Sequence, residues 1–175
     1  MKTPAKRRRR KGVRRTVTQM TTSVNTELLA ALTGMPPIPE LPGAIMAALG
    51  ASTPDMFHQI PILGYHTSIG VDTASVYLVT DRIFAMFEAN SAGRSYTLSV
   101  SLPRVRRVAR FEDNEYTRVI IEIDADRSTT SAILDPDGRS EGVVIPAGYE
   151  LLEASTTGRE ALRRFQTALT AAISL

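Results

Sequence analysis

The sequence contains no cysteine and only two histidines among its 175 residues. The absence of cysteine excludes disulfides and thiolate metal sites, and it leaves the redox compartment open. His58 and His66 form no His-x-x-x-His or Glu-x-x-His spacing, so we expect structural or surface histidines and no zinc site.

The motifs of common enzyme classes are also missing. There is no nucleophile elbow, phosphate-binding loop or dinucleotide fingerprint. Asp124-x-Asp126 and Asp135-x-Asp137 are the nearest approach to a cation site, but neither has the loop glycine and distal glutamate of an EF-hand. Both pairs lie near predicted turns, which aspartate favours. The sequence therefore predicts a protein that is not an enzyme and has no cofactor or metal.

Long apolar runs are absent as well. No segment approaches the roughly 18 apolar residues that span a bilayer, and no apolar stretch follows the basic N-terminus as in a secretory signal. The chain is 43% hydrophobic and 22% charged, as in ordinary soluble proteins. We expect a cytoplasmic protein with one domain and an extension.

The positive charge is concentrated at one end of the chain. Residues 1–15 hold nine of the 21 Lys and Arg residues and no acid. Residues 16–175 keep 12 arginines against 18 acidic residues, a formal charge of −6. We call residues 1–15 the basic arm, and we expect it to be disordered when free because it buries no apolar surface and repels itself.

A basic arm of this kind is typical of polyanion binding. Its charges would release counterions from nucleic acid, the leading target, and give a salt-sensitive affinity that is independent of sequence. An anionic membrane surface is the second target, and a solubilising tail or targeting signal is the third interpretation. No aromatic residue is interleaved, so base stacking is not indicated. The binding residues expected are Lys6, Arg7, Arg8, Arg9, Arg10, Lys11, Arg14 and Arg15.

The composition divides the chain into three segments. These are a basic arm and linker over 1–23, short helices over 24–59, and a β-rich domain with the terminal helix over 60–175. Asn25 is expected to cap the first helix, which ends at Gly34. The proline-rich connector 35–42 leads to a second helix, Gly43 to Leu49, and Thr53 or Ser52 before Pro54 could start one further turn. These helices pack either on the sheet or on a neighbouring subunit.

Strand patterns begin near Ile60. The clearest hairpin covers residues 74–88, with alternating apolar residues on either side of a turn at Thr80-Asp81-Arg82. Seven or so antiparallel strands are expected in all. Besides the two strands of this hairpin, the candidates are 62–69, 95–102, 104–111, 116–124 and 143–152, with 128–134 as a further short strand.

The chain ends in a predicted amphipathic helix. Thr157 and Glu160 have the spacing of a capping box. The apolar residues that follow recur at helical spacing and must be buried, for which the open mouth of a sheet or barrel is available. This stripe consists of Leu162, Phe165, Leu169, Ala172 and Ile173.

This arrangement resembles the pleckstrin-homology-like (PH-like) fold, a seven-stranded antiparallel roll or barrel capped by a C-terminal helix. Val79-Thr-Asp-Arg82 is similar to the turn of bacterial PH-like and GRAM-type domains, and Leu102-Pro-Arg-Val105 is similar to the step that follows it. The resemblance covers about residues 62–174. It implies a mainly β, α+β domain that acts as a binding or scaffolding module without enzymatic activity.

The resemblance does not extend to phosphoinositide binding. The candidate loop Gly70 to Ala74 has an acid and no base, whereas phosphate recognition needs charge-assisted donors. The nearest upstream residue that could carry positive charge is His66. Peptide binding beside the terminal helix, another use of the fold, stays open.

Arginines on the predicted strand 104–111 form a second candidate anion surface. Simple alternation places Arg104, Arg106 and Arg110 on one face, with Arg118 of the next strand beside them, and Arg107 on the apolar face. The alternative is a solvated face with cross-strand ion pairs to Glu122 and Asp124, which we favour.

The sequence thus favours a non-enzymatic binding or scaffold protein whose basic arm engages nucleic acid or another polyanion. A protein partner or self-association would also suit such a module. The alternative is a small viral coat protein whose arginine-rich arm neutralises packaged genome. The long terminal helix and the strand count favour the first interpretation.

Overall fold

The protein is described by a computed structural model that covers residues 24–33, 41–92, 95–124, 131–134, 140–143 and 147–174. The basic arm, most of the proline-rich connector and the expected turn at 135–138 lie outside these residues. No helix of the described part is long and apolar enough to cross a membrane.

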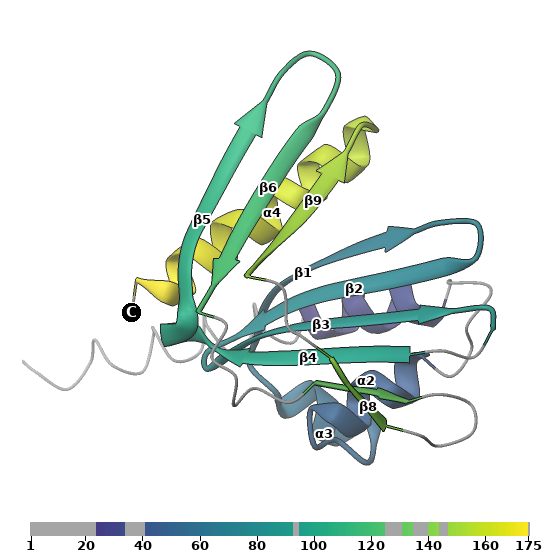
Figure 1. Ribbon diagram of the computed structural model, residues 1–175. Helices are drawn as coiled ribbons and strands as arrows, with labels where there is room; N and C mark the ends of the chain where they lie inside the picture. The colour runs from purple at the N-terminus through teal and green to yellow at the C-terminus, as the bar shows by residue number, and fades with distance from the viewer. Residues whose placement is uncertain are drawn as a thin grey trace, which may run out of the picture.

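The described strands form two antiparallel sheets (Figure 1). The first has the order β1-β2-β3-β4-β7-β8, and the second has the order β5-β6-β9. The strands are β1 (Ile62–Ile69), β2 (Thr73–Thr80), β3 (Ile83–Asn90), β4 (Ser95–Ser101), β5 (Val105–Glu112), β6 (Thr117–Ile123), β7 (Ser131–Leu134), β8 (Ser140–Val143) and β9 (Gly148–Glu153).

The expected mainly β, α+β class is confirmed, and seven strands of six to eight residues make up the two layers. Two four-residue strands, β7 and β8, extend the first sheet beyond β4. The described strands do not close into a barrel. The terminal helix α4 (Thr156–Ile173) packs against β1 and β2 of the first sheet and against all three strands of the second sheet.

The hairpin of β2 and β3 confirms the clearest sequence pattern. The strands pair in register from Val76 opposite Phe87 to Val79 opposite Phe84. The hydroxyl of Thr80 accepts hydrogen bonds from the amides of Arg82 and Ile83, both at 3.1 Å. The charged residues at the tip of the turn are exposed. Asp81 and Arg82 are therefore turn residues.

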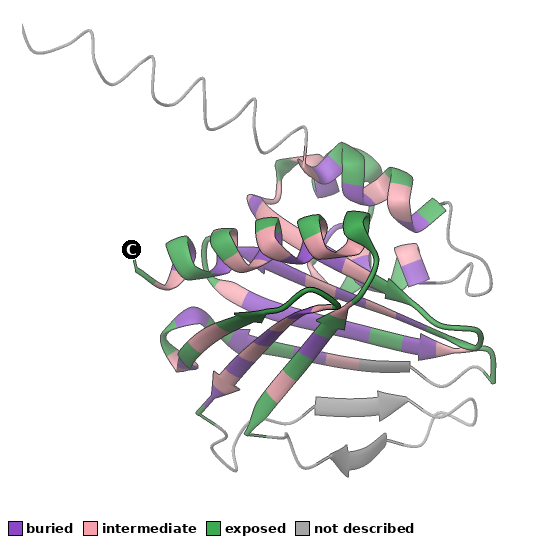
Figure 2. Ribbon diagram, turned by 90° about the horizontal axis from the view of Figure 1, so that it is seen from above, coloured by how far each residue is buried: buried purple, intermediate pink, exposed green. Residues whose placement is uncertain are grey.

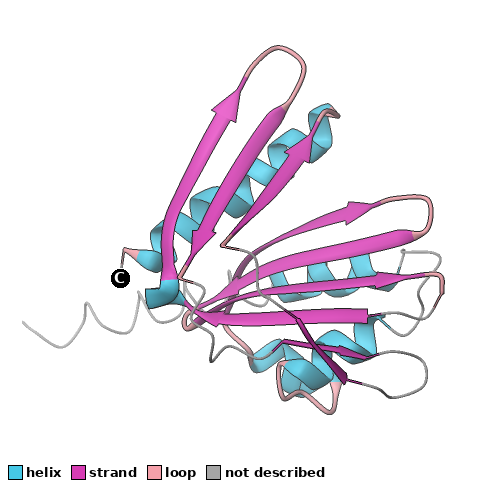
Figure 3. Cartoon of the chain, viewed as in Figure 1, coloured by secondary structure: helices cyan, strands magenta, loops and turns pink. Residues whose placement is uncertain are grey.

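Strands β2 and β3 of the first sheet have buried residues on both faces (Figure 2). One face packs on the N-terminal helices, which are residues 24–33, α2 (Leu41–Ala48) and α3 (Pro54–Gln59). The other face packs on α4 and the second sheet. Figure 3 shows α2 and α3 gathered on the side of the first sheet away from α4. The N-terminal helices therefore cover this chain's own sheet.

The first helix differs from the expectation at Asn25, which lies inside the helix and does not cap it. Its side chain is fully buried. The Nδ2 group donates to the carbonyl oxygens of Phe57 and Ile60, each at 2.8 Å. Carbonyls at a helix C-terminus lack intrahelical partners, so this amide satisfies the end of α3 and ties the two helices together.

The next two helices follow the sequence pattern more closely. α2 begins two residues before the expected Gly43 and ends at Ala48. Gly50, just beyond that end, has a φ of 76°, the left-handed conformation that glycine adopts readily. α3 has Thr53 as its N-cap, and the threonine hydroxyl accepts a hydrogen bond from the amide of Met56. Pro54 occupies the first helical position.

The apolar stripe of α4 is confirmed, but its cap is not. Leu162, Phe165, Leu169 and Ala172 are buried. The expected capping box at Thr157 is wrong because the helix starts earlier. Ser155 is the N-cap, and its hydroxyl accepts from the amide of Gly158 at 3.0 Å.

A glycine on β1 lets α4 lie close to the first sheet. A Cβ placed on Gly64 would be 2.6 Å from the Cβ of Ala168, closer than such atoms approach in real structures. Any larger residue at this position would push the helix away from the strand. Gly64 therefore fixes the distance between β1 and α4.

Candidate functional site

A groove with a volume of about 360 Å³ lies between the first helix, strand β1 and α4. We call it the β1 groove. Figure 2, the view from above, shows the two helices running beside the first sheet. The lining residues are Val24, Glu27 and Ala31 of the first helix, residues 63–67 of β1, and Ala161, Arg164 and Phe165 of α4.

The β1 groove runs along the edge of the first sheet. Within the described strands, β1 pairs only with β2. Five consecutive residues of β1 line the groove, although successive side chains of a strand point to opposite faces. A groove over one face would meet alternate residues. This groove therefore follows the strand's edge, where backbone N–H and C=O groups are not used by a neighbouring strand.

His66 connects the groove to the second sheet. It is 2% exposed, and its Nε2 lies 3.1 Å from Oε1 of Glu153 on β9. Its ring lies 6.3 Å from the ring of Tyr77 and 6.4 Å from that of Phe165. Burial lowers the pKa of His66 to about 4, and burial raises the pKa of Glu153. The neutral imidazole donates from Nε2, which leaves Nδ1 without a hydrogen-bond partner among the described residues.

We expect the domain to become less stable as the pH is lowered, because of His66. Its folded pKa of about 4 lies below the ordinary value of 6.5, so the unfolded chain takes up a proton first. Stability is therefore lost as pH falls from about 6.5 towards 4, by about 3 kcal/mol when complete. The contribution of Glu153 to stability depends on pH in the opposite direction. Its raised pKa stabilises the folded state below the ordinary pKa of 4.5, and this stabilisation is lost as the pH rises.

Urea unfolding at pH 7, 5.5 and 4.5 measures this loss, and His66→Gln isolates it. Glutamine keeps a hydrogen-bond donor for Glu153 but does not titrate. The difference in unfolding free energy between the two proteins should shift in favour of the variant as pH falls. Parallel pH profiles would contradict the assignment to His66.

Two opposite charges lie near the hydroxyl of Tyr65 in the β1 groove. The pKa of Tyr65 is raised by burial first and by the carboxylate of Glu27, while the guanidinium of Arg164 lowers it. Glu27 is on the first helix and Arg164 is on α4, so the two walls carry opposite charges. Among the described residues Arg164 takes part in no hydrogen bond or ion pair.

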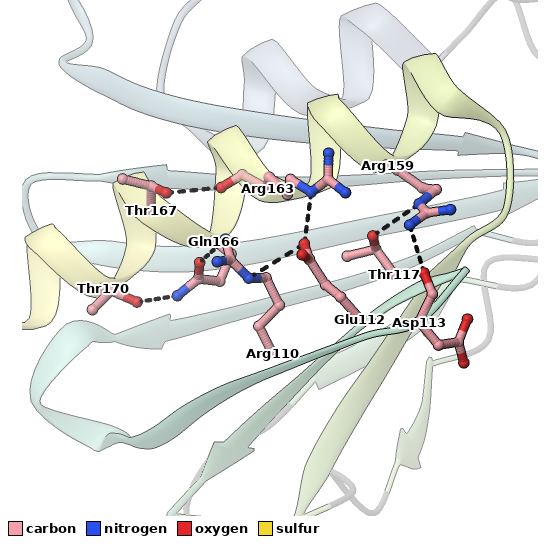
Figure 4. A network of polar contacts seen from close by, with 9 residues as sticks. All are labelled: Arg110, Glu112, Asp113, Thr117, Arg159, Arg163, Gln166, Thr167 and Thr170. Atoms are coloured by element: carbon pink, nitrogen blue, oxygen red, sulfur yellow. Dashed lines mark hydrogen bonds and ion pairs between the residues drawn. The ribbon is translucent and has the colours of Figure 1, made fainter. Parts of the chain in front are cut away.

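The neighbouring arginines of α4 hold the helix on the β5–β6 hairpin (Figure 4). Arg163 Nε lies 2.6 Å from Oε1 of Glu112, and this contact is the main reason why the pKa of Glu112 is lowered. Arg159 donates to the carbonyl of Asp113 at 2.7 Å and to the hydroxyl of Thr117 at 3.3 Å. These contacts fix one wall of the groove.

The expected arginine stripe is wrong in its geometry. A β-bulge between Val105 and Arg107 breaks the alternation, so Val108 packs on the core and Arg107 turns outward. Arg110 then falls on the helix side, where it donates to Gln166, whereas Arg118 lies on the outer face.

The favoured alternative, cross-strand ion pairing, is confirmed. Arg106 lies 2.8 Å from Asp124, and Arg107 lies 3.4 Å from Glu122. Arg118 lies 3.5 Å from Glu150 and stacks over the ring of Phe111. Arg104 donates to the carbonyl of Asp124 at 2.6 Å.

The described residues include no group of three or more His, Cys, Asp or Glu side chains that could hold a metal ion. His58 is half-buried at the end of α3 and lies outside the groove. The arm residues lie outside the described part of the chain, so their assignment stays a prediction.

Sequence patterns did not indicate the β1 groove. Its walls come from three segments that are far apart in the chain, and each residue is unremarkable in its own segment. Comparison with protein-family models, with curated proteins and with solved structures found no significant match for this chain.

Proposed function

We propose that this chain is a non-enzymatic binding or scaffold protein of the cytoplasm, with a PH-like domain and a basic arm that engages nucleic acid or another polyanion. The observation that carries the proposal is the separation of charge. Nine basic residues and no acid occupy residues 1–15, whereas residues 16–175 carry a formal charge of −6. Only the arm has a large unbalanced positive charge.

The ion pairs of the domain support this assignment. On the second sheet Arg106, Arg107 and Arg118 each lie beside a carboxylate. Such pairs leave little net positive potential for a polyanion. We therefore assign polyanion binding to the arm and not to the sheet.

The PH-like assignment is supported by the order of elements. Four consecutive antiparallel strands of the first sheet are followed by β5 and β6 of the second sheet, and β9 completes that sheet after β7 and β8 return to the first. One C-terminal helix then packs against both sheets. The Val79 to Arg82 turn lies in the hairpin of β2 and β3. A module of this kind presents edges and loops for binding, and the described residues hold no metal-ligand cluster.

Salt dependence tests the function of the arm. A 30-base-pair DNA duplex should bind with a log Kobs that falls linearly with log salt, with a slope of up to about −8 if all nine charges contact phosphates. Affinity should not depend on duplex sequence. Fluorescence anisotropy between 50 and 300 mM NaCl measures the slope. A flat salt profile would contradict the proposal, and closed shells in electron micrographs would favour the coat-protein alternative.

A further inference from the structure

We propose that the β1 groove binds an extended peptide segment of another protein, which adds to the first sheet as a strand beside β1. This site is separate from the basic arm and goes beyond polyanion binding.

The strand edge supplies the main recognition chemistry. β1 is eight residues long and, among the described strands, pairs on one side only. Residues 63–67 line the groove without interruption, so a peptide there could pair with the backbone along five residues. Exposed strand edges bind extended peptides through main-chain hydrogen bonds, and flanking pockets select alternate side chains.

The walls of the groove limit what can occupy it. The first helix and α4 stand on the two sides of the β1 edge. Neighbouring strands of a sheet lie about 4.8 Å apart. A second folded copy would have to bring its own β1 edge, flanked by the same two helices, to that distance. A single extended segment avoids this collision of helices, so we commit to a peptide rather than to a second copy.

The side chains of the walls define the peptide further. Side chains that point to one face of the new strand would meet Val24 and Ala31, and those that point to the other would meet Ala161 on the α4 wall. These contacts favour apolar residues at alternating positions. Arg164 lines the α4 wall and has no ion-pair partner in the described structure. Charge complementarity therefore calls for an acidic residue on the side of α4.

A phage-displayed library of random linear 12-residue peptides, panned on the full chain at 300 mM NaCl, tests the proposal. The high salt suppresses capture of acidic peptides by the basic arm. Enriched peptides should show alternating apolar residues and an acidic residue. Each should be synthesised with a fluorescent label, and its Kd should be measured by polarisation.

Two matched variants test whether the peptide binds in the β1 groove. Ala161→Trp fills the groove and should weaken binding at least tenfold. Ala171→Trp makes the same change on an exposed part of α4 outside the groove and should change Kd less than twofold. Circular dichroism melting shows whether each variant folds. Should Ala161→Trp fail to fold, Arg164→Glu, at an exposed position, should still weaken acidic peptides at least tenfold.

Hydrogen exchange supplies an independent readout, since strand addition should slow exchange of backbone amides in residues 63–67. Replacement of Arg7 to Arg10 by glutamine should leave peptide binding unchanged, which separates this site from the arm. The proposal is overturned by a library without enrichment, by peptides that bind Ala161→Trp and Arg164→Glu as tightly as the parent, or by unchanged β1 exchange.

Discussion

Replacement of Phe165 by alanine is expected to lower the free energy of unfolding by about 3–5 kcal/mol. Phe165 is fully buried, and its ring lies 6.4 Å from the rings of both His66 on β1 and Phe84 on β3. The ring centroid of Phe84 in turn lies 6.3 Å from that of Tyr149 on β9. The side chain thus fills the space where α4 and both sheets meet, and its loss leaves a cavity that these elements cannot readily close.

Chemical denaturation of the full chain measures this loss, with Thr167→Ala as the control. Thr167 is exposed on the same helix, where its hydroxyl donates to the carbonyl of Arg163. Its replacement should change stability by less than about 0.5 kcal/mol. Similar midpoints for the parent and Phe165→Ala would show that α4 is not part of the cooperative core.

The sequence was sufficient to predict the elements whose periodicity is strong. The hairpin around Thr80 and the apolar stripe of α4 were predicted because one face of each element is buried, which forces a period of two or of 3.6 residues. The position of the α4 N-cap was missed because two nearby residues compete for it. Ser155 and Thr157 are both good N-caps, and the path of the chain from β9 into α4 selects Ser155.

A single-residue bulge explains why the predicted faces of the β5 arginines are wrong. The bulge at Val105 shifts the following residues by one position, so Arg107 and Arg110 exchange the sides that alternation gives them. Such a slip moves every later side chain to the other face. No residue in the sequence marks this bulge, so simple alternation assigns Arg107 and Arg110 to the wrong faces.

The β1 groove depends on contacts that no local pattern encodes. Asn25 looks like a cap in the sequence but bonds the carbonyls of α3 more than 30 residues away. That contact helps to hold the first helix beside β1, where it becomes one wall. Gly64 and Ala168 similarly decide how closely the other wall approaches. Pairs so distant along the chain become visible only when the fold is known.

Deletion of the basic arm is expected to abolish duplex binding while leaving the domain folded. The nine charges of residues 1–15 supply the counterion release that drives such binding, and without them the remaining chain carries −6 and repels phosphate. The arm precedes the part of the chain that the structure describes, so its deletion leaves all the core residues of that part in place. Duplex affinity should drop at least 10³-fold at about 50 mM salt, with an unchanged thermal midpoint.

Substitutions within the arm separate charge from length. Replacement of Arg7 to Arg10 by glutamine should reduce the magnitude of the salt slope by about 3.6, because four phosphate contacts are lost at about 0.9 each. Replacement of the same four residues by lysine keeps the charge and should keep most of the slope. Anisotropy titrations of the three proteins compare the slopes directly. Equal slopes for the glutamine and lysine variants, or duplex affinity that survives the deletion, would place polyanion binding outside the arm.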